Sequence, residues 1–254
     1  MADYRSSLYS HYASIFQNSG IEFDAIAAER LGPAYEYYFR GWMPENKNGA
    51  ILDLACGDGK VLYFFRKWGF TNLSGVDISL EQVMLSRQVM PEVKQCNAID
   101  FLEEHPDSFD LITGLNIIEH LTKDEVCLFM ERCFAALKPG GRLVLLTPNA
   151  DSPFSCSVRY ADFTHEVCFN PRSLDSTLKV FGFKRIEMRE AGPPPRGYSA
   201  LSSLRWLIWR LLCVGIGFWN LVETGSSGSG IFTRVFLIKA EKAPRERPTR
   251  LTSA

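Results

Sequence analysis

The sequence predicts a single α/β domain built on a mostly parallel sheet. Short apolar runs typical of strands alternate with segments in which apolar residues recur every three or four positions, as they do in helices. Such alternation is typical of parallel strands joined by helices that cover both faces of the sheet. The 254 residues, 46% of them hydrophobic, are enough to bury one sizeable core.

The predicted elements follow one another in a regular order. The expected strands of the first part are 50–55, 73–76, 93–96, 109–115 and 142–147, and its expected helices are 60–68, 80–89 and 123–137. A long polar connection over 148–170 follows, and after it come a helix over 171–181 and strands over 183–190 and 231–240. A connection of this length is an expected place for a substrate-facing loop.

Segments outside this alternation set the expected domain organisation. Tyr9 and Tyr12 lie near the amino terminus at helical spacing, and we expect a helix there that closes over the site. The tail is rich in proline and arginine, as disordered segments are. The expected organisation is a helical lid region over 1–48, a main domain over 49–242 with an apolar helical insertion at 191–230, and a disordered tail over 243–254.

The insertion contains the most apolar stretch of the chain, residues 201–222. Trp206 and Trp209 alternate there with Arg205 and Arg210, a combination that suits a helix lying in a membrane interface better than one crossing it. Three interpretations stay open for this stretch: peripheral membrane contact, a hydrophobic lid or acceptor pocket, and a homodimer interface.

Composition limits the partners. Lysine and arginine number 28 against 29 acidic residues, so no general attraction draws the chain to a phosphate backbone, and we expect no nucleic-acid partner. The amino terminus lacks the apolar run of a signal peptide, so we expect a cytoplasmic protein, at the inner face of the membrane if the insertion docks there. The cysteines and histidines show no zinc-ligand spacing, and no metal is expected.

A glycine-bearing turn after the first strand indicates a ligand site. Gly57 and Gly59 let backbone amides approach a ligand at the positive end of the next helix. Asp77 ends the second strand about twenty residues later, where a carboxylate can bind both hydroxyls of a ribose. The pair predicts an adenosine cofactor, although nicotinamide dinucleotides are bound in the same way.

Four segments in order carry a closer resemblance. Ile51–Gly59, Gly75–Ser79, Asn97–Asp100 and Leu137–Gly141 resemble successive motifs of class I S-adenosylmethionine-dependent methyltransferases. The resemblance implies a Rossmann-like sheet of seven strands, mostly parallel, in which 231–240 is the one antiparallel strand and helices cover both faces. It also implies S-adenosyl-L-methionine as cofactor, which makes a Rossmann dehydrogenase the weaker alternative.

The same resemblance implies individual cofactor contacts. Around the methionine part of the cofactor it places Asp53, Ala55, Cys56, Gly57 and Gly59. It assigns the ribose to Asp77, the adenine to Ile78, Asp100 and Phe101, and the surroundings of the sulfonium to Asn116. Taken singly, an aspartate or asparagine at such positions is also a common helix cap or turn residue.

Two histidines are candidates for removing a proton from the methyl acceptor. His165 lies in the long polar connection, and the stretch 164–174 resembles methyltransferases that act on sugars and other small molecules. Asp162 or Glu166 is expected to orient its ring. His120 is the second candidate, because it follows the fourth strand near the cofactor edge.

The acceptor stays open among several classes. The first expectation is O-methylation of a sugar or another small polar acceptor, including a lipid-linked one in cell-surface glycan synthesis. The apolar insertion favours an alternative, a lipophilic small molecule such as a quinone precursor. From a different class, the chain is compatible with a non-catalytic adenosyl-binding scaffold.

Overall fold

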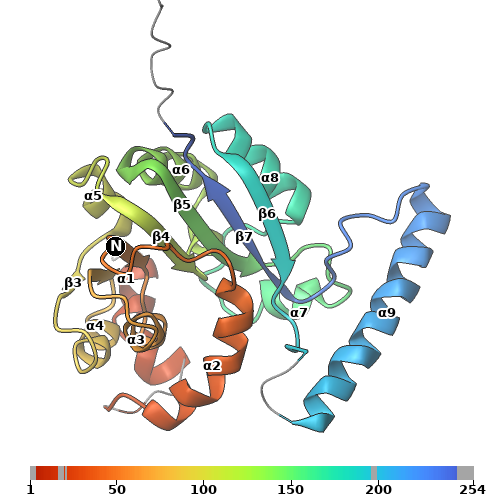
Figure 1. The fold of residues 1–254 in the computed structure, drawn as a ribbon, viewed down its shortest axis with the longest axis horizontal. Coiled ribbons are helices and arrows are strands. Elements are labelled where there is room, and N and C mark those ends of the chain that lie inside the picture. Colours follow the sequence, from red (N-terminus) through yellow and green to blue (C-terminus); the bar gives the residue numbers. More distant parts are fainter. Residues whose placement is uncertain (1–3, 17–19, 21, 196–198, 245–254) are drawn as a thin grey trace, which may run out of the picture.

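The computed structural model describes residues 4–16, 20, 22–195 and 199–244, and its sheet confirms the prediction (Figure 1). The strands lie in the order β3-β2-β1-β4-β5-β7-β6. They are β1 (Ile51–Leu54), β2 (Leu73–Asp77), β3 (Val93–Gln95), β4 (Phe109–Leu115), β5 (Leu137–Pro148), β6 (Lys184–Glu190) and β7 (Val235–Glu241). Only β7 runs against its neighbours among these strands, as expected of the last one.

Helices cover both faces of this sheet. They are α1 (Tyr4–Tyr9), the π-helix η1 (Tyr12–Phe16), α2 (Ala25–Phe39), α3 (Lys60–Lys67), α4 (Leu80–Ser86), α5 (Ala98–Glu103), the 3₁₀-helix η2 (Ile118–His120), α6 (Lys123–Ala136), α7 (Ser155–Arg159), α8 (Pro171–Val180) and α9 (Ala200–Thr224). Phe39 of α2 and Phe65 of α3 are buried against one face, and Phe129 of α6 and Leu174 of α8 against the other. The two apolar layers hold the sheet, and therefore the ends of its strands, in place.

Two elements differ from the prediction for local reasons. Strand β5 begins at Leu137, because the Pro139-Gly140-Gly141 segment continues the strand across a shift in its register with β4. Helix α5 was not expected, since six residues are too few to show a helical repeat. It begins where the side chain of Asn97 accepts a hydrogen bond from the backbone N–H of Ile99, 2.8 Å away.

The segments outside the main alternation occupy different places. Near the amino terminus, Tyr12 Oη donates to Asp162 Oδ2 (2.7 Å), and Ser14 Oγ donates to Glu81 Oε1 (2.9 Å), so η1 is tied to the domain. The insertion forms the long helix α9, which stands beside the sheet (Figure 1). The predicted disordered tail lies outside the described residues from position 245 onward.

Candidate active site

A cavity of about 1300 Å³ opens at the carboxyl ends of the central parallel strands. Its lining includes Ala55 after β1, Asp77 of β2, Asn97 after β3 and Asn116 after β4. The strand order reverses between β1 and β4, and in open α/β sheets ligands bind outside the strand ends at such a reversal. The cavity therefore lies where this architecture places a ligand.

The loop after β1 brings three small residues to the cavity. Ala55 and Gly57 both adopt left-handed conformations, with φ of 50° and 55°. The N–H of Cys56 donates to the carbonyl of Val76 (3.0 Å), which fixes the loop against β2. Ala55, Cys56 and Gly57 all line the cavity, as the resemblance implied.

Gly59 has a different role from the other residues of this loop. It is the amino-terminal cap of α3, with a φ of 86°, and it is not part of the cavity lining. A β-carbon here would lie 2.9 Å from Val89 Cγ2 and 3.0 Å from Ser86 Cβ. Position 59 is therefore a glycine because the start of α3 and the carboxyl-terminal end of α4 approach each other closely.

Asp77 is held by two backbone N–H groups. The N–H of Gly57 donates to its Oδ2 (2.9 Å) and the N–H of Ser79 donates to its Oδ1 (2.8 Å). Burial raises the pKa of this carboxyl above its usual value, and the two N–H donors act against that rise. Each oxygen keeps a lone pair for a further donor, so the carboxylate can accept hydrogen bonds from two vicinal hydroxyls. Ile78, next to it, is half exposed on the cavity wall and offers an apolar surface to a base.

Asp53 supplies a buried acid at the floor of the cavity. Thr113 Oγ1 donates to its Oδ1 at 2.6 Å, and burial raises the pKa of Asp53 to about 7. A cationic group in the cavity would stabilise the charged form of this acid. Asn116 also lines the cavity, in a left-handed conformation with φ of 58°, and its N–H donates to the carbonyl of Leu146 (2.8 Å).

The structure places two predicted adenine contacts outside the cavity lining. Phe101 is buried in the core and stacks on His105 at a ring-centroid distance of 4.1 Å, and Asp100 is exposed on α5. Because α5 begins at Ala98, it turns those two side chains away from the cavity. Ala98 and Ile99 of the same segment line it instead, two residues before the predicted positions.

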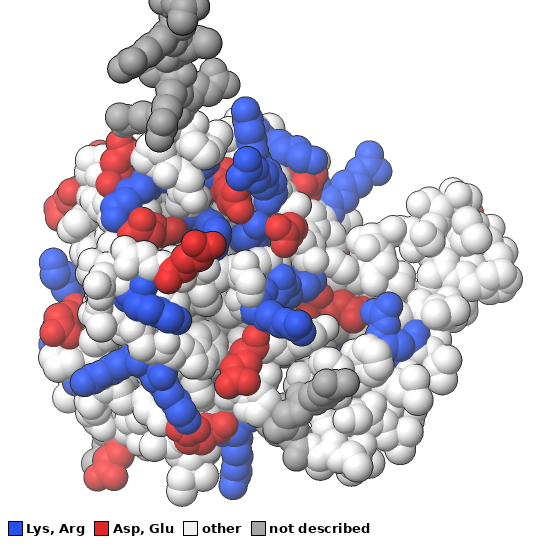
Figure 2. Space-filling view, viewed as in Figure 1, with Lys and Arg blue, Asp and Glu red and all other residues white. Residues whose placement is uncertain are grey.

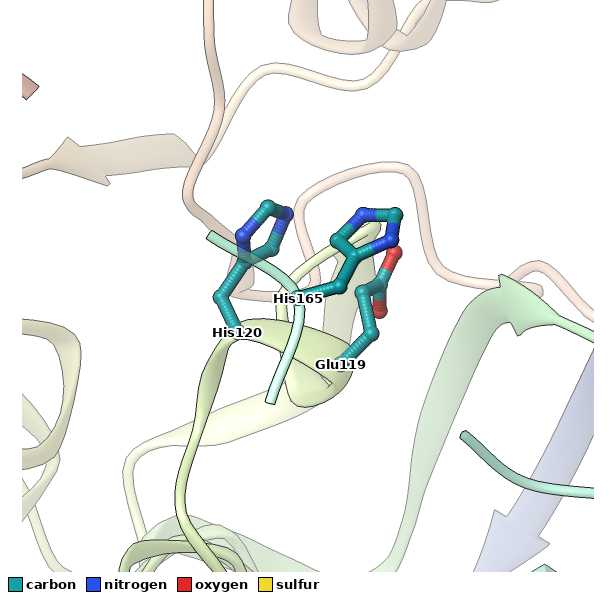
Figure 3. A group of neighbouring side chains, drawn as sticks. All are labelled: Glu119, His120 and His165. Carbon is teal, nitrogen blue, oxygen red and sulfur yellow. The ribbon is translucent and has the colours of Figure 1, made fainter. Parts of the chain in front are cut away.

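The two candidate histidines meet beside a buried acid. Figure 3 shows the side chains of Glu119, His120 and His165 next to one another, and one possible ligand atom from each lies within 4.8 Å of the others. All three line the cavity. The rings of His120 and His165 meet edge to face, with centroids 4.8 Å apart. The structure therefore brings both predicted histidines to the same wall of the site.

His120 is held as an unprotonated imidazole. Its Nδ1 lies 2.8 Å from Thr164 Oγ1, and that hydroxyl donates to Asp162 Oδ1 at 2.6 Å. The hydroxyl therefore accepts from Nδ1–H of His120, which leaves Nε2 without a proton. Burial is the largest cause that lowers the pKa of His120 to about 4, and the neighbouring His165 adds to it.

His165 is oriented by a backbone carbonyl and not by the expected acids. Its Nδ1 lies 3.2 Å from the carbonyl oxygen of Arg159, which can only accept, so Nδ1 carries a proton and the lone pair of the neutral imidazole is on Nε2. Asp162 instead acts on His120 through Thr164. Glu166 accepts a hydrogen bond from the hydroxyl of Tyr4.

Glu119 was not among the predicted site residues. Its Oε2 accepts a hydrogen bond from Thr147 Oγ1 (3.1 Å), and its Oε1 is buried without a partner among the described residues. Burial raises the pKa of Glu119 to about 8, so the carboxyl is largely protonated at neutral pH. An acid directly before a candidate histidine, just after a buried strand, was the available signal for it in the sequence.

These three side chains can also hold a cation. Two imidazoles with free Nε2 atoms and one carboxyl form a ligand set of the kind that divalent metals use. The spacing of residues did not indicate such a set, because His165 comes from a separate segment. That no metal is needed stays a prediction, since metal binding would require the carboxyl of Glu119 to lose the proton that its raised pKa retains.

The amino-terminal segment lies over the histidine side of the cavity. Tyr9 and Tyr12 line it, and each ring centroid lies 6.4 Å from that of His120. Arg5, also in the lining, forms an ion pair with Glu125 at 2.6 Å. These contacts are those expected of a lid, and the lid itself stays a prediction.

Comparison with known proteins gives a consistent family. A family model described as a methyltransferase domain matches residues 23–188, more than half of the chain. A ubiquinone biosynthesis O-methyltransferase of Idiomarina loihiensis is 31% identical over 39% of this chain and 42% of its own length. One with the same name from Rhodopseudomonas palustris is 28% identical over 52% of this chain and 57% of its own. The chain thus spans about half the length of the curated relatives it matches.

Solved structures support the fold. An S-adenosylmethionine-dependent methyltransferase of Archaeoglobus fulgidus has a TM-score of 0.61 and 21% identity, over 94% of this chain and 100% of that one. A phosphoethanolamine N-methyltransferase of Haemonchus contortus, solved with S-adenosyl-L-methionine, has a TM-score of 0.54 and 16% identity, over 93% of this chain and 60% of that one. The site fits that cofactor: Asp53 suits its ammonium group, Asp77 and the glycine-bearing turn suit its ribose, and the apolar surface of Ile78 suits its adenine. The chain belongs to the class I S-adenosylmethionine-dependent methyltransferases, and S-adenosyl-L-methionine is its cofactor.

Proposed function

We propose that this methyltransferase transfers the methyl group to a hydroxyl oxygen of a lipophilic phenol of the quinone-precursor kind. The observation that carries the proposal is the pair of imidazoles, His120 and His165, whose Nδ1 atoms both face a hydrogen-bond acceptor, so that the neutral rings have their lone pairs on Nε2. An acceptor hydroxyl must lose a proton, and such a lone pair can take it. The names of the curated relatives support the acceptor class.

The bound cofactor supplies an electrophilic methyl group on a sulfonium. The chain's own part is to hold cofactor and acceptor in line, with Asp77 on the ribose and Asp53 near the ammonium. In this proposal Nε2 of His165 accepts the proton that the acceptor hydroxyl loses. The lowered pKa of His120, about 4, makes that imidazole a weak base, so its part is to accept a hydrogen bond that positions the hydroxyl.

The wall around the histidines suits an aromatic ring. Tyr9, Tyr12, Val158 and Ala161 lie in the cavity lining with them. The same lining also contains Arg5, which favours a polar acceptor such as a sugar as the second candidate. The aromatic and apolar side chains outnumber the charged ones there, and we place the phenol first.

The test is a methyl-transfer assay with labelled S-adenosylmethionine, a catechol-type phenol and a sugar nucleotide, each in separate reactions. We expect the phenol to be methylated, and His165→Ala to lower kcat by about 100-fold or more without changing cofactor affinity. His105→Ala, outside the cavity lining, is the matched control.

Other outcomes assign other functions. Transfer to the sugar alone would favour the polar acceptor, including a lipid-linked glycan. Tight cofactor binding with no transfer to any acceptor would favour the non-catalytic scaffold. Loss of transfer on chelation, restored by a divalent cation, would show that Glu119, His120 and His165 bind metal and would contradict the proton-acceptor role of His165.

A further inference from the structure

Helix α9 exposes an apolar surface that the methyltransferase domain leaves uncovered. The helix has 25 residues, about 37 Å at 1.5 Å per residue. It is the one helix of the described residues whose length and composition would allow it to cross a membrane, and only 11% of its most apolar window is buried. Helices that are apolar on most sides are normally covered by protein or lipid.

One face of α9 is attached to the domain. Trp209 Nε1 donates to Glu190 Oε2 (3.3 Å), Cys213 Sγ lies 3.5 Å from Glu190 Oε1, and Arg210 forms an ion pair with the same carboxylate at 3.5 Å. Ser202, Trp206, Trp209 and Cys213 recur at helical spacing and are the less exposed side chains of the helix. Glu190, the last residue of β6, thus anchors the middle of α9.

The opposite face carries no charge. It consists of apolar side chains at helical spacing, each at least 48% exposed: Leu204, Leu207, Ile208, Leu211, Phe218 and Val222. We call these six the outward face. The charged residues of the helix, Arg205, Arg210 and Glu223, lie between the two faces, by their helical spacing. In the view of Figure 2 the helix accordingly presents an almost uncharged surface.

The connections of α9 exclude a crossing. Residues 225–234 must return from its end to β7, and they include three serines and Arg234. Ser229 Oγ donates to Asp151 Oδ2 (3.0 Å), so the carboxyl-terminal end of α9 lies within about 17 Å of the domain surface, the reach of five residues. At the other end, Ser203 Oγ donates to the carbonyl of Pro195 (3.0 Å). A spanning helix would need one end on the far side of about 30 Å of hydrocarbon.

We propose that α9 lies in the plane of a phospholipid bilayer, with the outward face in the acyl-chain boundary. The width of the apolar surface favours lipid over a second copy of the chain. A partner helix covers one stripe, whereas here the flanking Leu201, Leu212, Val214 and Trp219 are also exposed. Gly215 and Gly217, two residues apart, form no seam of small residues for close helix pairing.

Charge at the edge of the apolar face fits lipid headgroups. Arg205 is exposed and forms no ion pair with any residue that the structure describes, and acidic residues are missing from 200–222. A cation at the flank of an in-plane helix lies at headgroup level, where it can pair with phosphate. The bilayer is also where a lipophilic acceptor dissolves, and this last point rests on the proposed function.

The experiment is flotation of the full chain with vesicles of equal phosphatidylcholine and phosphatidylglycerol. We expect the wild type to float, and Leu211→Glu combined with Phe218→Glu to weaken binding by at least about tenfold, since each change removes one apolar side chain from lipid. Val180→Glu, at an 80% exposed apolar position of α8, is the matched control and should float as the wild type does. Arg205→Gln should weaken only the part of binding that salt removes.

Three outcomes would overturn the proposal. The wild type fails to float, or it forms a dimer by light scattering that the double variant dissolves without any vesicle binding. Protection of 225–230 from a protease added outside the vesicles would show a crossing instead of an in-plane helix. Methylation of a water-soluble phenol should be equal in the wild type and the double variant, so failure of the proposed acceptor chemistry is detected separately.

Discussion

The cofactor side and the acceptor side of the cavity are built in different ways. On the cofactor side, Gly57, Asp77 and Asn116 lie at the ends of parallel strands, and the pairing of those strands fixes where each one ends. On the acceptor side, His120 of η2 and His165 of the long connection meet through side-chain contacts. Strand pairing thus fixes the positions of the residues on the cofactor side. The positions of the residues on the acceptor side depend on how segments distant in the sequence pack.

The largest expected effect tests whether the cofactor half depends on its strand-end acid. Asp77→Ala removes the ribose acceptor and leaves the N–H groups of Gly57 and Ser79 without their partner. We expect S-adenosylhomocysteine to bind at least about 100-fold more weakly, by isothermal titration. Asp100→Ala makes the same charge change outside the cavity lining and should stay within about twofold. Equal losses of affinity in the two variants would show that Asp100 contributes to cofactor binding, as the resemblance implied.

The next effect separates packing from ligand contact within the same loop. Gly59→Ala adds left-handed strain and a contact of 2.9 Å with Val89, so we expect a loss of about 2–4 kcal/mol in unfolding free energy. Gly69→Ala has a similar φ and nothing within 4 Å, and about 1–2 kcal/mol is expected. Urea titrations followed by circular dichroism measure both. A smaller loss at Gly59 than at Gly69 would contradict the packing role.

The smallest expected effect is the pH dependence of the unfolding free energy that Glu119, on the acceptor side, contributes. The pKa of Glu119 is raised from 4.5 to about 8 on folding, so its contribution to stability is complete below pH 4.5 and is lost as pH rises through 8. Between pH 7 and 8 we expect the wild type to lose on the order of 1 kcal/mol relative to Glu119→Gln, in urea titrations with chelator present. Both proteins keep His120, so its opposite trend cancels. Parallel pH profiles would show that Glu119 is already ionised, as in a metal site.

The same division governs what the sequence could predict. The strands along the chain and the place of Asp77 at the end of one of them follow from alternation and motif, because strand ends are local features of a chain. Asp100 and Phe101 lie outside the cavity lining, since the six-residue helix α5 gives no periodic signal that would have predicted where its side chains point. Glu119 was missed and the acids thought to orient His165 were wrong, because the path of 149–170 sets those partners. For residues 201–222 the apolar pattern predicted a helix, but it did not predict which side of that helix faces away from the domain.

The hydrogen-bond chain from Tyr12 through Asp162 and Thr164 to His120 connects the amino-terminal segment with the histidine wall of the cavity. Any movement that lifts Tyr12 removes a donor from Asp162, which can then draw the Thr164 hydroxyl and the Nδ1 proton of His120 into a different arrangement. A movement of the amino-terminal segment that opened the site would therefore also change the hydrogen bonds that fix the tautomer of His120. Turnover in such an enzyme would carry a solvent isotope effect on release as well as on chemistry.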